Sequence, residues 1–302
     1  MSQPFRAASV PDQSGRTVVV TGANTGIGWE AASVLAGKGA RVLLACRSPE
    51  KGNAALGRIQ ELHPDADLAF VPLDLGSLES VRKGAARIDG EERLDLLINN
   101  AGIMMPPREE TAEGFESQFG VNHLGHFALT GLLLGKLRET AGARVVTVSS
   151  GAHKAGRIQF DDIHAKKRYG RVERYGMSKL ANLLFTHELQ RRLEAARHGT
   201  AALACHPGVS ETELSRNFPS WMKLLTPLFK PFSHPPPEGA LPTLRAATDP
   251  EARGGEYYGP GGLAELSGPP VLNQPSRASR DPEVARRLWD LSIELTGVDP
   301  GI

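Results

Sequence analysis

The sequence contains almost no cysteine and no long apolar run, and each scarcity excludes a class of protein. Only Cys46 and Cys205 are present among 302 residues, so no disulfide framework can hold the fold. We expect both to be small buried hydrophobes, as is typical of a reducing compartment. No run of about 18 apolar residues occurs, and residues 1–15 lack the apolar core of a secretory signal. The sequence therefore predicts a soluble, cytoplasmic protein without a transmembrane segment.

An excess of charge of one sign is also lacking. The chain carries 35 basic and 34 acidic side chains, a net charge of +1, so we expect no broad basic surface and no nucleic-acid partner. The chain shows no internal repeat and no linker that would divide it. One domain is expected over residues 15–302, preceded by a flexible N-terminal tail at residues 1–14.

Glycine, by contrast, is abundant, with 33 residues, and one glycine-rich stretch stands between two regular elements. The sequence TGANTGIG, Thr21 to Gly28, follows a β-branched run at Thr17–Val20 and precedes a helical pattern at Ile27–Leu35. A helix that begins in such a turn exposes unpaired backbone N–H groups, which suit a pyrophosphate. The spacing is G-x-x-x-G-x-G instead of the common G-x-G-x-x-G, so an ordinary strand-to-helix turn is the alternative.

Strand-like and helix-like segments alternate along the rest of the chain. Nearly continuous apolar runs predict strands at residues 40–46, 68–75, 94–100, 143–150 and 200–207. Helical patterns lie at 49–61, 77–88, 174–196 and 282–296, with a long stretch at 111–139 and a proline-rich region after residue 207. This order predicts a single-domain α/β fold, a doubly wound parallel sheet of the Rossmann type with about seven strands.

Polar residues follow six of the predicted strands. In a doubly wound sheet, ligands bind beyond the carboxyl ends of the strands, where the strand order reverses. We therefore expect one crevice to collect the residues at these strand ends, which are Gly22–Gly28, Arg47, Asp74, Asn99, Ser149, Ser150 and His206–Gly208.

Six motifs occur in an order that resembles one enzyme family over nearly the whole chain. They are TGANTGIG, NNAG at Asn99–Gly102, VNHLGHF around Asn122, VSS ending at Ser150, Tyr175-x-x-x-Lys179, and HPG at His206–Gly208. This set resembles the short-chain dehydrogenase/reductase family. The stretches ACR, HPGVSETEL and YGMSKLANLLF, and the insertion at residues 155–172, look most like its retinol dehydrogenase-like branch. The resemblance implies an oxidoreductase that interconverts a carbonyl and an alcohol on an apolar small molecule.

Tyr175 and Lys179 have a spacing that suits acid–base chemistry. Four residues apart on a helix, they point the same way. Free tyrosine has a pKa of about 10, so a general acid near neutrality needs a nearby cation, which Lys179 supplies. An amphipathic helix residue with a solvated neighbour is the alternative. The resemblance implies that Ser150 binds the substrate oxygen and that Asn122 completes a proton relay. Ser149 is the alternative serine.

The end of the second predicted strand bears on the choice of cofactor. A site for NAD places Asp or Glu there to accept the ribose 2′-OH, whereas an arginine favours the 2′-phosphate. Here the acid's place is taken by Cys46, Arg47 follows, and Lys51 lies one helical turn further on. Because a guanidinium can pair bidentately with phosphate, we expect NADP(H) to be preferred, with NAD(H) as the alternative.

The family resemblance also implies a wider set of cofactor-binding residues. Lys179 should hold the nicotinamide ribose, beside Tyr175, and Asp74 and Leu75 should flank the adenine. The remaining residues are Gly22, Asn24, Thr25, Gly26, Ile27 and Gly28 in the first loop, Asn99, Ala101 and Gly102 in the second, and Pro207, Gly208, Val209 and Thr212 on the nicotinamide side.

Other features are expected to be structural or to concern partners. His123 and His126 have a spacing that a metal could use, but no acidic or cysteine residue completes the set, so no metal is expected. The segment Phe218–Phe232 carries apolar residues at helical intervals and predicts a substrate lid near residues 210–237, with a core-covering helix or a weak membrane-surface contact as alternatives. Family members frequently form homodimers or homotetramers. A dinucleotide-binding sensor without turnover is the rival function.

Overall fold

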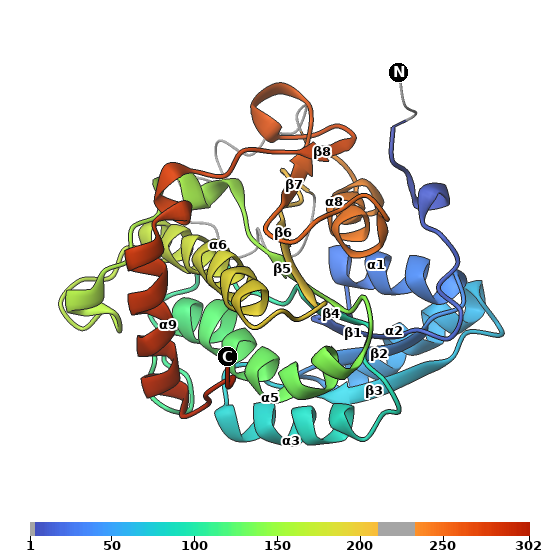
Figure 1. Ribbon diagram of the computed structural model, residues 1–302, viewed down its shortest axis with the longest axis horizontal. Coiled ribbons are helices and arrows are strands. Elements are labelled where there is room, and N and C mark those ends of the chain that lie inside the picture. Colours follow the sequence, from blue (N-terminus) through green and yellow to red (C-terminus); the bar gives the residue numbers. More distant parts are fainter. Residues whose placement is uncertain (1–3, 211–232) are drawn as a thin grey trace.

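A single eight-stranded sheet organises the part of the chain that the structure describes. The computed structural model describes residues 4–210 and 233–302 (Figure 1). The strand order is β3-β2-β1-β4-β5-β6-β7-β8, and all neighbours are parallel except the last pair. The strands are β1 (Thr17–Thr21), β2 (Arg41–Cys46), β3 (Leu68–Pro72), β4 (Leu96–Asn99), β5 (Arg144–Val148), β6 (Ala201–Cys205), β7 (Tyr257–Pro260) and β8 (Pro270–Leu272).

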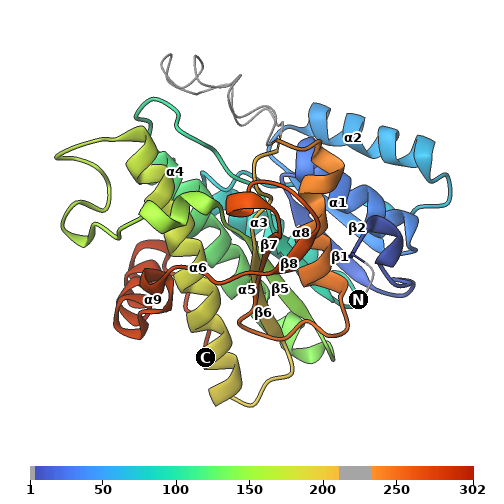
Figure 2. The same ribbon diagram turned by 90° about the horizontal axis from the view of Figure 1, so that it is seen from above.

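Helices cover both faces of this sheet (Figures 1 and 2). One face packs against α1 (Gly26–Gly37), α2 (Pro49–Leu62) and α8 (Pro236–Thr248), and the other against α3 (Leu78–Asp89), α5 (Gly125–Glu139) and α6 (Arg171–Ala195). Strands between two helical layers are buried on both faces, which explains their continuous apolar sequences. Every residue of β1, for example, is buried. The predicted doubly wound α/β fold is therefore confirmed, with one strand more than expected.

The C-terminal helix α9 (Pro282–Thr296) packs on α6 (Figure 2). Trp289 lies stacked on Phe185, with ring centroids 6.0 Å apart, and meets the edge of Phe127 at 5.1 Å. The guanidinium of Arg192 lies 4.5 Å above the same indole. Helix α9 therefore covers parts of α5 and α6 of the same chain.

Three elements of the second half were not anticipated. The proline-rich region contains α8. Prolines are tolerated in its first turn, because the N–H that proline lacks would have no partner within the helix at that position. Pro242 within the helix hid the periodic pattern further. The strands β7 and β8 are only 4 and 3 residues long, too short for a clear alternation.

The N-terminal residues also differ from the expected free tail. A short 3₁₀ helix forms at Ala7–Ser9, and Val10 and Gln13 are buried. The backbone N–H of Gln13 donates to the carbonyl of Lys38, 2.8 Å away, at the end of α1. In the described part of the tail, these residues therefore pack against the body of the protein.

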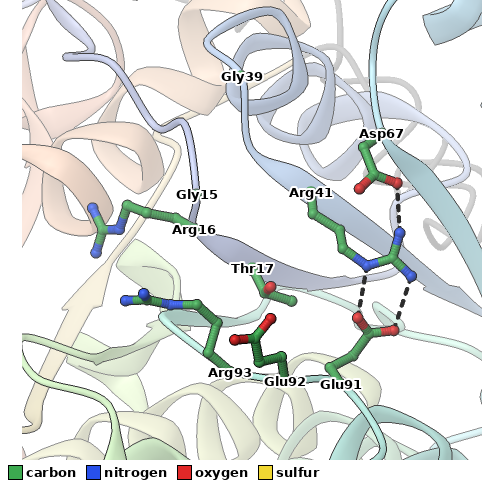
Figure 3. Close-up of a pocket in the computed structure, with 9 residues that line it drawn as sticks. All are labelled: Gly15, Arg16, Thr17, Gly39, Arg41, Asp67, Glu91, Glu92 and Arg93. Carbon is green, nitrogen blue, oxygen red and sulfur yellow. Dashed lines mark hydrogen bonds and ion pairs between the residues drawn. The ribbon is translucent and has the colours of Figure 1, made fainter.

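A cavity of about 490 Å³ lies at the amino edge of the sheet, opposite the expected ligand edge (Figure 3). Much of its charged lining is paired: Arg41 binds Glu91 through two hydrogen bonds and also binds Asp67. Beside it, Asp95 is 2% exposed and accepts hydrogen bonds from Thr17 N at 2.9 Å and from the Arg93 guanidinium at 2.7 and 2.8 Å. These pairs join the amino ends of neighbouring strands and give the cavity a structural role.

Replacement of Asp95 should therefore weaken the fold. We expect Asp95→Ala to lower the free energy of unfolding by about 3 kcal/mol, because it leaves the Thr17 N–H and the arginine charges without their partner. Urea unfolding measures the difference. The matched control is Glu92→Ala, an exposed carboxylate of the same cavity, which should change stability by less than about 0.5 kcal/mol. Equal effects of the two changes would contradict this role.

Candidate active site

The glycine-rich loop between β1 and α1 approaches the end of β4 so closely that side chains are excluded. Gly22 and Gly26 have φ angles of 66° and 57°, a region that favours glycine. A Cβ on Gly22 would lie 2.9 Å from the Cα of Ala101, and one on Gly28 would collide with Asn100 Nδ2 and the Gly22 carbonyl. The loop therefore follows one narrow path along the carboxyl edge of the sheet.

Thr21 joins this loop to the second predicted cofactor loop. Its hydroxyl oxygen accepts hydrogen bonds from the backbone N–H groups of Asn100 and Ala101, both at 2.9 Å. Its carbonyl accepts one from Asn100 Nδ2 at 2.8 Å. The two loops that the sequence assigns to one ligand therefore lie in direct contact.

The start of α1 fits a pyrophosphate. Thr25 is the N-cap residue, and within the described chain its side chain makes no capping hydrogen bond. The N–H groups of the first turn are therefore left to a ligand, and the helix dipole favours an anion there. Together with the glycine path, this arrangement fits a dinucleotide bound along residues 22–28.

The end of β2 offers cations and no carboxylate. Cys46 is buried, and burial raises the pKa of its thiol to about 11 although the nearby backbone N–H groups of Ala23 and Asn24 act to lower it. This position is thus uncharged at neutral pH. Arg47 and Lys51 are exposed, and neither forms an ion pair within the described residues.

Arg58 is a further cation at this loop that the motif-based analysis missed. Its Nη2 donates to the carbonyl of Asn24 at 2.8 Å, and its guanidinium lies 4.9 Å above the ring of Trp29. Arg58 follows Lys51 by seven positions on α2, a spacing that places both on one helix face. That spacing was the available signal.

Tyr175 and Ser150 meet at the carboxyl end of β5. The Tyr175 phenol lies beside the Ser150 side chain, which acts to lower the pKa of Tyr175, and Tyr175 is 6% exposed. The Ser150 hydroxyl oxygen also accepts from the backbone N–H of Ala152 at 3.2 Å. Ser149 instead donates its hydroxyl to the carbonyl of Lys179, 2.8 Å away. Of the two serines, it is Ser150 that faces the phenol.

Lys179 lies beneath the Tyr175 ring and is only 4% exposed. Its Nζ is 5.8 Å from the ring centroid and donates to the carbonyl of Val148 at 3.1 Å. Burial lowers the pKa of Lys179 to about 8, so the ammonium is charged at pH 7.

The pKa of Tyr175 differs from the sequence-based expectation. We expected Lys179 to make the phenol more acidic, but burial raises the pKa of Tyr175 to about 12, and only the nearby Ser150 side chain opposes the rise. Desolvation disfavours the phenolate more than Ser150 favours it. The phenol is therefore protonated at neutral pH, the state that a proton donor requires.

Asn122 lies in a π-helical stretch, Gly120–Leu124, that leads into α5. Such stretches are frequent at functional sites. Its side-chain oxygen accepts from Ile103 N at 2.8 Å, and its Nδ2 donates to the Ile103 carbonyl at 3.0 Å and to Ser178 Oγ at 2.9 Å. A Cβ on Gly102 would lie 3.2 Å from Asn122 Oδ1 and 3.5 Å from Lys179 Nζ, so this loop lies against both residues.

The remaining predicted cofactor residues are held mainly by local contacts. Asp74 Oδ1 accepts from Gly76 N at 2.9 Å, Leu75 is buried, and Asn99 Nδ2 donates to Thr130 Oγ1 at 2.9 Å. Thr212 and the segment Phe218–Phe232 lie outside the described residues.

The turn after β6 is also fixed in place. Gly208 has a φ of 74° and donates its N–H to His206 Nδ1 at 3.3 Å, and Val209 N donates to the Leu266 carbonyl at 2.7 Å. Pro207 lies between these contacts. His206 thus takes part in the hydrogen bonding of its own loop.

Neither a metal site nor a membrane span is found in the described part of the chain. No group of at least three His, Cys, Asp or Glu side chains there could hold a metal ion. His123 contacts Ser292 through Nε2 at 2.9 Å, and burial lowers its pKa to about 3. Among residues 4–210 and 233–302, no helix is long and apolar enough to cross a bilayer.

The fold belongs to the doubly wound α/β class, and this edge has the features of a dinucleotide site, so comparison with known proteins is needed to give the family. The model of the short chain dehydrogenase family matches residues 16–223. The chain belongs to the short-chain dehydrogenase/reductase family, in its retinol dehydrogenase-like branch. It is therefore an oxidoreductase that acts on alcohols and carbonyls with NAD(P).

Individual relatives are similar over most of their length. The chain is 46% identical to retinol dehydrogenase 12 of Mus musculus over 288 residues, 94% of this chain and 87% of the relative. It is 44% identical to retinol dehydrogenase 11 of Homo sapiens, covering 94% of this chain and 86% of that one. A crystal structure of an uncharacterized protein from Mycobacterium Paratuberculosis is 42% identical with a TM-score of 0.84, covering 99% of this chain and 100% of its own.

The buried charge of Lys179 gives a stability prediction whose sign depends on pH. We expect Lys179→Met to raise the free energy of unfolding by about 2 kcal/mol at pH 7, because it removes a cation that burial disfavours. The wild-type penalty is complete below pH 8 and declines between pH 8 and 10.5, where the folded protein has lost the proton and the unfolded chain still holds it. The gain should therefore shrink over that range.

Denaturant unfolding at pH 7 and pH 10 tests this prediction. The control is Lys83→Met, which removes an exposed lysine of α3 that is paired with Glu79 and should change stability little at either pH. A gain for Lys179→Met that stays constant with pH would show that lost polarity, and not lost charge, is responsible.

Proposed function

We propose that this protein is an NADP(H)-dependent enzyme that reduces a carbonyl, or oxidises the corresponding alcohol, with Tyr175 as the proton donor or acceptor. The observation that carries the proposal is the buried contact of Tyr175 with Ser150, above the ammonium of Lys179. It supports the proposal because the protonated phenol and the charged amine are the states that carbonyl reduction needs at neutral pH.

In this proposal each residue has one task. The cofactor, when bound, supplies or accepts the hydride. The Ser150 hydroxyl binds the substrate oxygen and holds it beside the Tyr175 hydroxyl. Tyr175 gives its proton to that oxygen during reduction and takes it back during oxidation. Lys179 stabilises the phenolate that forms, because an ammonium favours a developing negative charge in a site with little water.

The cofactor preference rests on charge at the end of β2. A buried neutral thiol at Cys46 offers no acceptor of the strength of a carboxylate to a ribose 2′-OH. The exposed Arg47 and Lys51 have no ion-pair partner within the described chain and can contact a 2′-phosphate. A solved structure that is 25% identical in sequence to this chain, with a TM-score of 0.63, is named a Pseudomonas aeruginosa RhlG/NADP active-site complex.

The proposed substrate is an apolar aldehyde or ketone, or the matching alcohol. Several relatives are named retinol dehydrogenases, and a retinoid-like or lipid-derived compound fits that likeness. The lid predicted near residues 210–237 contains the segment Phe218–Phe232, whose apolar residues include Trp221 and Leu225. The non-catalytic sensor remains the rival, and loss of turnover in site variants separates the two.

Removal of the phenolic hydroxyl should stop turnover without loss of the cofactor. We expect Tyr175→Phe to lower the rate of carbonyl reduction by roughly a hundredfold or more, because the proton donor is gone. Loss of NADPH absorbance with a panel of aldehydes and ketones measures the rate, and NADPH fluorescence measures binding. Ser150→Ala should also lose most activity, whereas Ser149→Ala should lose less. An unchanged rate in Tyr175→Phe would overturn the assignment of the proton donor.

Cofactor preference should depend on Arg47. We expect Arg47→Gln to weaken NADPH binding by about tenfold, or about 1.4 kcal/mol, because a charge-assisted contact with the 2′-phosphate is lost. NADH, which lacks that phosphate, should bind about as before. Titration of both cofactors measures the two dissociation constants, with Arg138→Gln on the exposed end of α5 as the control. Equal weakening of both cofactors would exclude phosphate recognition by Arg47.

A further inference from the structure

His126 connects the cofactor loop to the turn that carries Asn122. It is buried in the first turn of α5, and its ring makes two hydrogen bonds. Nδ1 lies 3.0 Å from the backbone carbonyl of Asn122, and Nε2 lies 2.9 Å from the hydroxyl of Thr21. Residues 21 and 122 are far apart in sequence, so this one side chain makes a long-range link across the site.

The partners of the ring fix its protonation. A carbonyl oxygen can only accept, so Nδ1 carries the hydrogen that is donated to Asn122. Burial lowers the pKa of His126 to about 4, helped by the nearby charge of Lys179, so the ring is neutral. Nε2 is then an acceptor, and the Thr21 hydroxyl must donate to it.

Thr21 has no hydrogen-bonding capacity to spare once it donates to His126. Its oxygen already accepts the N–H groups of Asn100 and Ala101, which occupy both lone pairs. The other acceptor in reach, the Ile98 carbonyl, is more distant at 3.3 Å. The direction of the Thr21 hydroxyl, and with it the position of residues 100–101, therefore depends on the imidazole.

The other end of the link reaches the catalytic candidates. The Asn122 side chain is fully engaged with Ile103 and Ser178, so its carbonyl is the group that His126 can hold. The charge of Lys179 contributes to the lowered pKa of His126, so the ammonium lies near the imidazole ring. A charged imidazole here would place a second cation beside Lys179, whereas a neutral one adds hydrogen bonds without charge.

We propose that His126 is a positioning residue that holds the Asn122 turn and the loop after β4 in register through Thr21. The role of this link in turnover rests on the proposed function, but the link itself does not. His126 is not proposed as a catalytic residue. It contacts Thr21 and Asn122 and would affect the reaction only through their positions.

Two conservative variants separate the ends of the link. In His126→Asn the amide nitrogen occupies the place of Nδ1 and keeps the donor to Asn122, but the acceptor for Thr21 is lost. In His126→Gln the amide reaches the place of Nε2 and keeps the contact with Thr21, but the donor to Asn122 is lost. Thr21→Val removes the hydroxyl with little change of shape and, because it also removes the acceptor of the Asn100 and Ala101 N–H groups, should loosen the loop after β4 at least as much as His126→Asn. His123→Leu is the control, because His123 is also a buried histidine but contacts Ser292 of α9.

Amide hydrogen exchange, measured by mass spectrometry on peptides covering residues 98–103 and 119–126, is the first readout. We expect His126→Asn and Thr21→Val to exchange at least tenfold faster in the first peptide, which contains the N–H groups bound to Thr21. His126→Gln should exchange faster in the second peptide, and His123→Leu should leave the first within about twofold of wild type. Exchange at residues 98–103 in His126→Asn that is no faster than in His123→Leu would overturn the proposal, whatever the result for Thr21→Val.

Turnover is the second readout. We expect kcat per cofactor-binding molecule to fall about tenfold in both His126→Asn and His126→Gln, with less change in His123→Leu, because either break frees the Asn122 turn from the cofactor loop. An unchanged kcat in both variants would overturn the positioning role. A wild-type protein that turns over no carbonyl would instead defeat the proposed function, while the exchange data would still decide whether His126 forms the link.

Discussion

A positive charge buried beneath an aromatic ring is the constraint on which this site depends. An ammonium removed from water is costly unless polar groups surround it, and Lys179 is held by the carbonyl of Val148 at the end of β5. The same carbonyl accepts from Asn182 Nδ2 at 3.1 Å, so two side chains of α6 converge on one strand end. Ser149 in turn binds the Lys179 carbonyl. These contacts dock α6 on β5 and thereby place Tyr175 over Ser150.

Close contacts between backbones fix the loops at the cofactor edge, as the hydrogen bonds to the strand end fix α6. Gly22, Gly28 and Gly102 each lie where a Cβ would press on a neighbouring loop or on the Asn122 and Lys179 side chains. Gly176 has the same property within α6, where a Cβ would lie 3.0 Å from the Ala152 carbonyl in the segment after Ser150. The site is therefore assembled from backbones in near contact, which leaves little freedom for the side chains between them.

The sequence predicted the parts of this arrangement that depend on local pattern. Thr21–Gly28 could be placed between a strand and a helix, and the strand ends could be assigned to one edge, because β-branched runs and parallel topology determine both. Contacts between distant segments could not be predicted. The link of His126 to Thr21 has no local signal, and His126 was interpreted only by its spacing from His123. The pKa of Tyr175 also depends on burial, which no spacing of residues reveals.

The structure keeps polar groups where an apolar core would be more stable. In the described part of the chain, Asn99 Oδ1, Thr147 Oγ1 and Asn182 Oδ1 are buried without a hydrogen-bond partner. Asn99 and Thr147 are register partners on β4 and β5, and Asn182 lies one turn beyond Lys179 on α6. Each such oxygen costs about 1–3 kcal/mol relative to a paired one. Asn182 donates to the same Val148 carbonyl that accepts from Lys179 Nζ, so an apolar residue at position 182 would remove a polar neighbour of the ammonium, whose charged form is disfavoured among hydrocarbon. The polarity at position 182 is therefore better explained by the need to keep Lys179 charged than by the stability of the fold.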